Sequence, residues 1–425
     1  MAKIKAFKAV IYNQEKVKDL SRVVCPPYDV ISSQKQDYYH ELSPRNFIHI
    51  ILGRDIPGED KYQRAAQYFK EWLKEGVFTQ DEHPAIYFYS QQYSLMGEKK
   101  TRVGFISLLH LGEKDSSALR HEHTRREAKE DRLKLIKKVK ANLSPIFAVF
   151  QDKKRMMQRI YQRHIEGKEP FIEVVDDDKV VHKVWRLDSP EAISAMQAGM
   201  REEDVFIADG HHRFEVACAY RDEMKRKLEK VTGDEDFNYL LTYFTTADSR
   251  GLSILPIHRL LKFKERIDPY GFEEKLKDYF DVEEFKDKTR FFFLMNKGGR
   301  SEHVLGVYQQ RKYRLLRLKN VKILNKVMSD KPDAYRTLDV SMLNAIVFKE
   351  ILGFSPENNP DITYSPNAEE LIERVDSDDS CLAFFLNPVR MQQIIAVALK
   401  GERMPAKSTY FYPKLLSGLL VNKFG

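Results

Sequence analysis

The sequence has few cysteines and no long apolar run, and each shortage excludes a class of protein. Its 425 residues include three cysteines, Cys25, Cys218 and Cys381, without a C-x-x-C pair. Three such cysteines cannot build a disulfide framework and are consistent with a reducing compartment. No window approaches the roughly 18 apolar residues that span a membrane, and the first residues lack a signal-peptide core. We therefore expect a soluble, cytoplasmic protein without a membrane partner.

A strong excess of one charge is also missing. Lys and Arg number 71 and Asp and Glu number 63, so the formal net charge is +8. Spread over a chain that is 32% charged, this excess describes a solvated surface rather than the basic footprint of a nucleic-acid-binding protein. The length, with 42% apolar residues, predicts a folded protein of two or three domains.

The most informative stretch lies around Asp209-Gly-His-His-Arg213. The apolar run before it reads as a buried strand, and the apolar residues after it recur at helical spacing. This polar cluster is therefore predicted to open a helix, where the first backbone N–H groups lack intrahelical partners and the helix dipole is positive. A phosphate suits that position: Gly210 permits close backbone approach, and the guanidinium of Arg213 can bind the same anion. The alternative is a capped turn, with Asp209 as N-cap and Arg213 paired with a local carboxylate.

A second polar stretch covers residues 120–132. Thr124 and Glu127 have the form of a capping box, so we expect a helix from Thr124 through Val139. Residues 120–140 contain nine Lys or Arg and four Asp or Glu, an excess of five positive charges (9 − 4). This pattern is typical of a solvated helix face with i,i+4 pairs, and it leaves open a nucleic-acid surface whose affinity would fall steeply with salt.

Together the two stretches allow a phosphotransferase site. Arg213, with Lys129 and Arg132, would neutralise phosphates, Asp209 would hold Mg2+, and Glu122 would deprotonate an attacking hydroxyl. His211 is a further catalytic candidate. A zinc site remains an alternative, since four histidines lie in these stretches: His121, His123, His211 and His212. The zincin signature and the G-x-S-x-G elbow of serine hydrolases are both absent.

A stretch near the end of the chain has the spacing of a P-loop without its other features. Gly401 precedes Lys407-Ser408 at the required distance, but Ala406 replaces the second glycine and the flanking pattern is helix then strand. We reject the motif and keep Lys407 and Ser408 as candidate phosphate ligands.

Elsewhere, periodicity predicts several elements. Strands are predicted over 47–52, 85–93, 102–111, 238–244 and 290–295, and helices over 62–74, 190–200 and 333–352.

Five segments in order along the chain resemble one known family. They are residues 25–31 (CPPYDVI), 121–132, 142–147 (NLSPIF), 208–213 (ADGHHR) and 403–414 (RMPAKSTYFYPK). As a set they are similar to the bacterial and archaeal domain-of-unknown-function family 1015. More distantly, that family resembles the ParB-like superfamily, which includes sulfiredoxin, the CTP-binding ParB proteins and the archaeal free serine kinase.

The resemblance implies a mixed α/β (α+β) fold with a ParB/sulfiredoxin-like core at 116–250, an N-terminal α/β region at 1–115 and a C-terminal α+β domain at 251–425. It implies that nucleotide phosphates bind at Gly210, His211, His212 and Arg213, with ATP, ADP or CTP as the nucleotide and Mg2+ beside it. Through the free serine kinase it implies a kinase for a small hydroxylated metabolite such as free serine, with Glu122 as base. A non-catalytic nucleotide-binding switch and a homo-oligomer remain open.

Overall fold

The computed structural model describes residues 2–112, 118–119, 126–263, 269–356, 359 and 361–425. These residues pack as two compact units. The described residues of the first unit fall within 1–119, 124–253 and 413–425, and those of the second within 254–412. The predicted domain boundaries after residues 115 and 250 stay a prediction.

The first unit is built on a mixed sheet whose strands run in the spatial order β10-β7-β11-β5-β4-β9-β8. The strands are β10 (Phe206–Asp209), β7 (Ile146–Phe150), β11 (Tyr239–Thr246), β5 (Glu98–His110), β4 (Ile86–Leu95), β9 (Val181–Leu187) and β8 (Ile172–Val175), with β1 (Ile4–Lys5) beside β5. Strands β7 and β11 are parallel, and the other pairs are antiparallel. This order sets β10 at the edge of the sheet, where helix α7 follows it.

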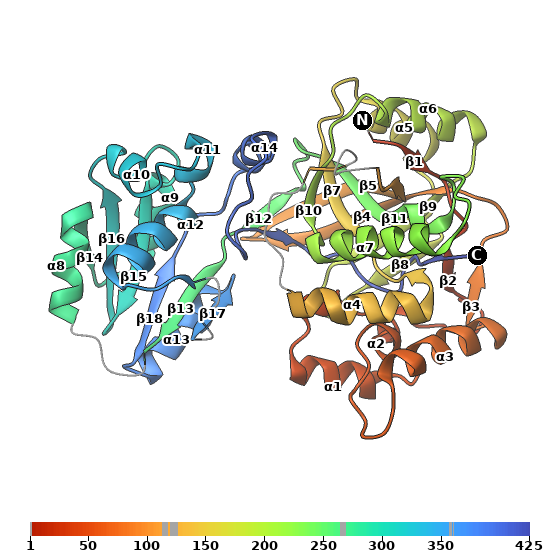
Figure 1. The fold of residues 1–425 in the computed structure, drawn as a ribbon, viewed down its shortest axis with the longest axis horizontal. Coiled ribbons are helices and arrows are strands. Elements are labelled where there is room, and N and C mark those ends of the chain that lie inside the picture. The colour runs from red at the N-terminus through yellow and green to blue at the C-terminus, as the bar shows by residue number, and fades with distance from the viewer. Residues whose placement is uncertain (1, 113–117, 120–125, 264–268, 357–358, 360) are drawn as a thin grey trace. The chain divides into compact units, whose positions relative to one another are not determined.

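Helices surround this sheet (Figure 1). They are α1 (Ser33–Leu42), α2 (Ile48–Ile51), α3 (Lys61–Lys74), α4 (Arg126–Val139), α5 (Met156–His164), α6 (Pro190–Met200) and α7 (His211–Lys227), with short 3-10 turns η1 (Leu20–Arg22), η2 (Tyr28–Val30) and η3 (Asp236–Asn238). Buried Met156 and Met196, from α5 and α6, share a core with Phe88 and Phe105 of the sheet. Helix α4 packs against both α3 and α7.

Two short antiparallel pairs close the first unit. Strand β2 (Val10–Tyr12) pairs with β3 (Phe78–Gln80), and β6 (Ala141–Asn142) pairs with β20 (Asn422–Lys423). The pair of β6 and β20 joins the segment 413–425 to the first unit, although residues 254–412 of the second unit precede this segment in the sequence. Leu419, Leu420 and Val421 in that segment are buried.

The second unit has an antiparallel sheet in the order β14-β16-β15-β18-β13-β17. The strands are β14 (Phe280–Phe285), β16 (Lys312–Leu318), β15 (Val304–Gln309), β18 (Cys381–Phe385), β13 (His258–Lys262) and β17 (Ile362–Ser365). The helices are α8 (Pro269–Tyr279), α9 (Lys288–Gly298), α10 (Lys322–Val327), α11 (Asp333–Arg336), α12 (Asp339–Met342), the π-helix η4 (Leu343–Ile351), α13 (Ala368–Ser377) and α14 (Met391–Leu399). Strands β12 (Ser253–Leu255) and β19 (Tyr410–Tyr412) pair with each other.

The predicted strand over 47–52 is wrong, because this run forms the short helix α2. The side chain of buried Asn46 accepts the N–H of Ile48 at 2.9 Å and donates to the Arg22 carbonyl at 2.8 Å, which fixes a helical turn there. A short, fully buried apolar run has no periodicity that separates a strand from a helix.

Two predictions in the second unit also need correction. Residues 290–295 were predicted as a strand but lie in helix α9, whose N-cap Asp287 accepts the N–H of Arg290. The predicted helix over 333–352 is not continuous, because the backbone at Leu338 is extended (ψ 134°) between α11 and α12. The π-helix η4 then follows α12 directly.

The predicted mixed α/β class is confirmed, as are the strands over 85–93 and 102–111, which pair as β4 and β5, and the helices α3 and α6. No helix among the described residues is both long and apolar enough to cross a lipid bilayer.

Candidate functional site

Helix α7 begins where the sequence pattern predicts. Strand β10 ends at Asp209, Gly210 takes a left-handed backbone conformation (φ 90°), and the helix starts at His211. Gly210 is the N-cap and no side chain caps this helix end, so Asp209 does not have the capping role that the alternative interpretation gave it. A Cβ at residue 210 would lie 2.9 Å from Cγ2 of Ile146 and 3.1 Å from Nε and Cζ of Arg213. Only glycine therefore lets the Arg213 guanidinium lie against the helix start.

The Asp209 carboxylate links two cations. Its Oδ2 accepts a hydrogen bond from Nη2 of Arg213 at 2.8 Å, and its Oδ1 accepts one from Nζ of Lys414. All three side chains are at most 16% exposed. Burial alone would raise the pKa of Asp209, but the charges of Lys414 and Arg213 outweigh it and hold that pKa well below its usual range. Two cations therefore share one carboxylate in a partly dry setting.

Arg213 also reaches a second predicted motif. Its Nη1 donates to the carbonyl of Pro145, in the stretch 142–147. In the same stretch the Ser144 hydroxyl lies 2.7 Å from that of Ser417, and the Asn142 amide oxygen accepts from Asn422 at 3.2 Å. The segment 413–425 thus fixes both the loop before β7 and the carboxylate beside α7.

Another arginine, the buried Arg132, lies on α4. Its Nη1 donates to the Ile51 carbonyl at 2.6 Å, its other nitrogens pair with Asp131, and its guanidinium lies 4.2 Å from the ring centre of Tyr28. Burial, followed by the charge of Asp29, raises the pKa of Tyr28 to about 12, although Arg213 and Arg132 oppose the shift. Tyr28 is therefore a neutral hydroxyl at physiological pH.

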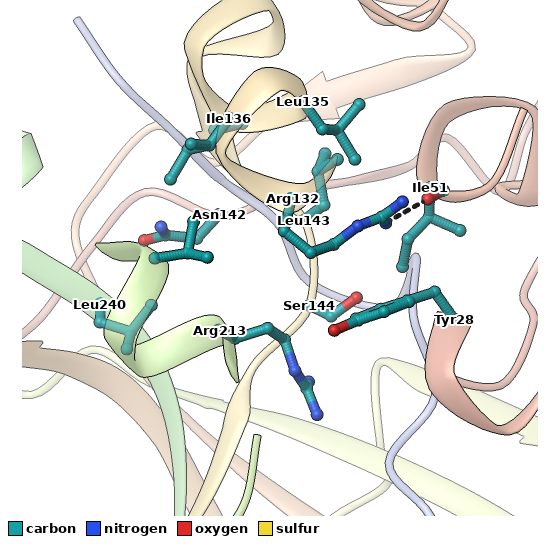
Figure 2. A pocket seen from close by; sticks show the side chains of 12 residues that line it. Tyr28, Ile51, Arg132, Leu135, Ile136, Asn142, Leu143, Ser144, Arg213 and Leu240 are labelled. Atoms are coloured by element: carbon teal, nitrogen blue, oxygen red, sulfur yellow. Dashed lines mark hydrogen bonds between the residues drawn. The ribbon is translucent and has the colours of Figure 1, made fainter. Parts of the chain in front are cut away.

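Arg132 and Arg213 line one hollow in the first unit, together with Tyr28 (Figure 2); its cavity volume is about 60 Å³. Its other described lining residues are Ile51, Leu135, Ile136, Ala141, Asn142, Leu143, Ser144, Val216 and Leu240. Figure 2 shows the Tyr28 hydroxyl between the side chains of Arg132 and Arg213. The described part of the stretch 120–132 therefore meets the stretch 209–213, which the sequence alone could not establish.

This arrangement combines polar groups that favour an anion with walls that favour an apolar group. Guanidinium groups bind phosphate or carboxylate through planar pairs of N–H donors. Leu135, Ile136 and Leu143 offer the opposite surface. Sites for small molecules usually have such a mainly apolar lining with a few convergent polar groups.

The structure places the remaining predicted residues as follows. On α4, Lys129 pairs with Glu215 of α7 at 3.0 Å. At the start of α7, His211 is buried and His212 is partly exposed. Lys407, exposed, and Ser408, buried, belong to the second unit, and the Ser408 hydroxyl donates to the Pro405 carbonyl. Glu122, with the predicted cap Thr124 and with His121 and His123, lies outside the described residues.

The described residues suit an anion better than a metal cation in this hollow. Mg2+ needs several oxygen ligands, and both oxygens of Asp209 already accept hydrogen bonds from cations. None of the described residues that line the hollow is an aspartate or glutamate. Across the described part of the chain, no three His, Cys, Asp or Glu side chains gather as a metal site.

The sequence interpretation did not identify Lys414 as a site residue. Lys414 ends the quoted segment 403–414, but 205 positions separate it from Asp209. Tyr28 was available in the segment 25–31, where two prolines before it fix an extended turn. Arg102 is buried, and its guanidinium lies 4.7 Å from the ring centre of Phe147. The sequence offered no reason to single it out, because it lies inside a predicted strand.

Comparison with known proteins adds the following findings. The sequence pattern of a family described as "Protein of unknown function (DUF1015)" matches residues 4–341. No curated protein matches the chain.

Solved structures show a loose likeness. A mutant free serine kinase in complex with ADP has 10% identity and a TM-score of 0.36, covering 72% of this chain and 87% of its own. SbnI with C-terminal truncation from Staphylococcus aureus has 10% identity and a TM-score of 0.38, covering 74% and 86%. A conserved hypothetical protein from Pyrococcus furiosus has 11% identity and a TM-score of 0.35, covering 73% and 92%. Likeness at this level carries no function to the present chain.

Proposed function

We propose that this chain, which belongs to the DUF1015 family of proteins of unknown function, binds the phosphates of a nucleotide in the hollow between Tyr28, Arg132 and Arg213. The convergence of two guanidinium groups on one hollow, that of Arg132 buried and that of Arg213 partly buried, carries this proposal. Arg213 lies at the start of α7, where the helix dipole adds to the attraction of an anion. Lys414 adds a third positive charge through its contact with Asp209.

The apolar walls support a nucleoside as the rest of the ligand. Leu135, Leu143 and Val216 would contact a base or ribose while the arginines hold the phosphates. These contacts do not distinguish ATP, ADP and CTP, because each base offers an apolar face. The family resemblance supplies these three nucleotides as candidates.

The finer proposal is phosphoryl transfer to a small hydroxylated metabolite, with free serine as the candidate from the resemblance. The substrate oxygen would attack the terminal phosphorus, the bond to the bridging oxygen would break, and Glu122 would accept the hydroxyl proton. Asp209 would position Arg213 and Lys414, and Arg132, Arg213 and Lys414 would stabilise the developing charge. The described donors of the hollow do not fit Mg2+. Further candidate residues that remain untested are His211, His212, Lys129, Lys407 and Ser408.

One observation favours a second candidate, a non-catalytic nucleotide-binding module. The described lining of the hollow offers no carboxylate that could act as a base. A coupled assay with ATP or ADP and a panel of amino acids separates the two functions. Nucleotide binding without phosphoryl transfer to any acceptor would leave the module, whereas turnover that is lost in Glu122→Gln would establish the kinase.

Titration calorimetry with ADP, ATP and CTP tests the binding proposal. Replacing Arg213 by Ala should weaken binding by about 1.5–3 kcal/mol, because charged hydrogen bonds to the phosphate would be lost. Arg132→Ala should weaken it as well. The control is Arg226→Ala, on the same helix but exposed and outside the hollow, which should bind like the wild type. If the wild type binds none of the three nucleotides, the proposal is wrong.

A further inference from the structure

Two histidine rings outside the hollow face each other in the first unit. His40 of α1 and His49 of α2 have their Nδ1 atoms 3.1 Å apart, with the ring planes at 90°. The Nε2 atom of His40 lies 3.1 Å from the Leu52 carbonyl oxygen, and that of His49 lies 3.2 Å from the Ser43 carbonyl oxygen. Both rings are partly exposed. Helices α1 and α2 are neighbours in the fold (Figure 1).

Two neutral imidazole rings do not have enough N–H groups to make hydrogen bonds in all three of these contacts. A neutral imidazole has one N–H, and a carbonyl oxygen only accepts. If both rings donate to their carbonyls, the two Nδ1 lone pairs face each other at 3.1 Å. If one N–H bridges the rings instead, one Nε2 lone pair faces a carbonyl oxygen. Every neutral assignment therefore leaves one repulsive contact, and a cation between the Nδ1 atoms would remove it.

The geometry resembles that of two metal ligands. Histidines that bind a metal usually donate their other N–H to a backbone carbonyl or a carboxylate, which fixes the tautomer. Zn2+ binds imidazole nitrogen at about 2.0–2.1 Å, so two nitrogens at a tetrahedral angle lie about 3.3 Å apart. The observed 3.1 Å between the Nδ1 atoms is close to this spacing.

The charges of Arg54 and Arg64 oppose a cation at these rings, but both arginines are paired with carboxylates. Arg54 lies near both rings, but it pairs with Asp37 at 2.8 Å and with Glu41 at 3.5 Å. Arg64, near His49, pairs with Glu59. Two arginines therefore stand against three carboxylates, and the local balance is one negative charge.

We propose that His40 and His49 are the two protein ligands of a site for a divalent transition metal of the class that prefers imidazole, such as Zn2+. No third His, Cys, Asp or Glu completes a metal cluster among the residues that the structure describes, so water fills the remaining positions. A site with two protein ligands and open positions holds an exchangeable metal rather than a permanent structural one. His40 and His49 do not line the proposed nucleotide hollow, although α2 also supplies Ile51 to it.

Calorimetric titration of the untagged full chain with ZnCl2 at pH 7.5 tests this proposal. We expect one Zn2+ per chain, and an affinity at least about tenfold lower in His40→Gln and in His49→Gln, because each substitution removes one of two ligands. His83→Gln, a substitution of an exposed histidine, should leave the affinity unchanged. Added Co2+ should give visible absorption bands that both ligand variants lack.

Three outcomes would overturn the site: no Zn2+ binding by the wild type, equal binding by both ligand variants, or an effect of His83→Gln as large as theirs. Circular dichroism of the metal-free variants shows whether each still folds. A variant that does not fold leaves the other variant and the wild-type titration as the test.

Discussion

At the scale of single residues, Asp209 is the carboxylate that allows Arg213 and Lys414 to be buried together. We expect Asp209→Asn to destabilise the fold by about 3 kcal/mol at pH 7, because two largely buried cations would lose their shared counterion. Urea unfolding measures this difference. Arg213 and Lys414 would also be less well placed for an anion, so nucleotide affinity should fall in the same variant.

The effect of Asp209→Asn should depend on pH in a defined direction. The folded pKa of Asp209 is lowered, so its contribution is fully present above the unfolded value of about 3.9 and is lost as the pH falls toward the folded pKa. The gap between wild type and variant should therefore stay constant from pH 5 to 8 and shrink below about pH 4. Asp188→Asn, at an exposed position, is the control. A gap that does not narrow in acid would contradict the assigned pKa.

Sequence reasoning located part of this site. Asp209, Gly210 and Arg213 were predictable because a change of periodicity marks a helix start in the chain itself. Lys414 was not, because its contact with Asp209 depends on how a segment 205 positions away returns to the sheet. Local patterns carry no information about such a return.

At the scale of elements, the start of α7 depends on Gly210. An alanine there would have to adopt a positive φ and would approach Ile146 and Arg213 within 2.9 and 3.1 Å. The left-handed conformation alone costs about 1–2 kcal/mol in a residue with a Cβ. Gly58→Ala is a matched control, since Gly58 has φ 84° and no atom within 4 Å of the added carbon.

Chemical unfolding of both variants separates the two contributions. Gly58→Ala should show the backbone cost alone, and Gly210→Ala should lose more stability than Gly58→Ala. Gly210→Ala should also lose nucleotide affinity, whereas Gly58→Ala should not. Equal losses in the two variants would mean that close packing around Gly210 is unimportant.

The positive charges of helix α4 are compensated within the protein, so a count of charges along the sequence could not identify a binding partner. Its stretch has an excess of five positive charges in sequence, but Lys129 pairs with Glu215, Lys137 with Glu223 and Lys138 with Asp60. The compensating carboxylates belong to α7 and to the start of α3. The prediction of a strand at 47–52 was wrong for the same reason, because it was based on the local sequence alone. The hydrogen bonds of Asn46, including one to Arg22, decide the conformation of this run.

At the scale of the whole molecule, the second unit interrupts the first between residues 253 and 413. Strands β12 and β19, at the two ends of the second unit, pair with each other, so a short linker can join those ends. We expect a chain with a Gly/Ser linker in place of 254–412 to fold and to bind ADP like the full chain, because all described residues of the hollow belong to the first unit.

Urea unfolding and calorimetry of that shortened chain provide the measurement. A single cooperative transition with retained ADP binding is the expected result, and it would also support the predicted boundary after residue 250. A shortened chain that remains unfolded would show that the first unit needs the second for its stability. A linker chain that also carries Arg213→Ala is the control for binding.

The return of residues 413–425 to the first unit also has a consequence during protein synthesis. Ribosomes synthesise the chain from its N-terminus, so a domain that begins to fold early stays incomplete until its later segments have been made. Asp209 and Arg213 are made long before Lys414, and the second unit is synthesised between them. A nascent or prematurely terminated chain that stops before Lys414 therefore has Arg213 and Asp209 without the lysine that shares this carboxylate.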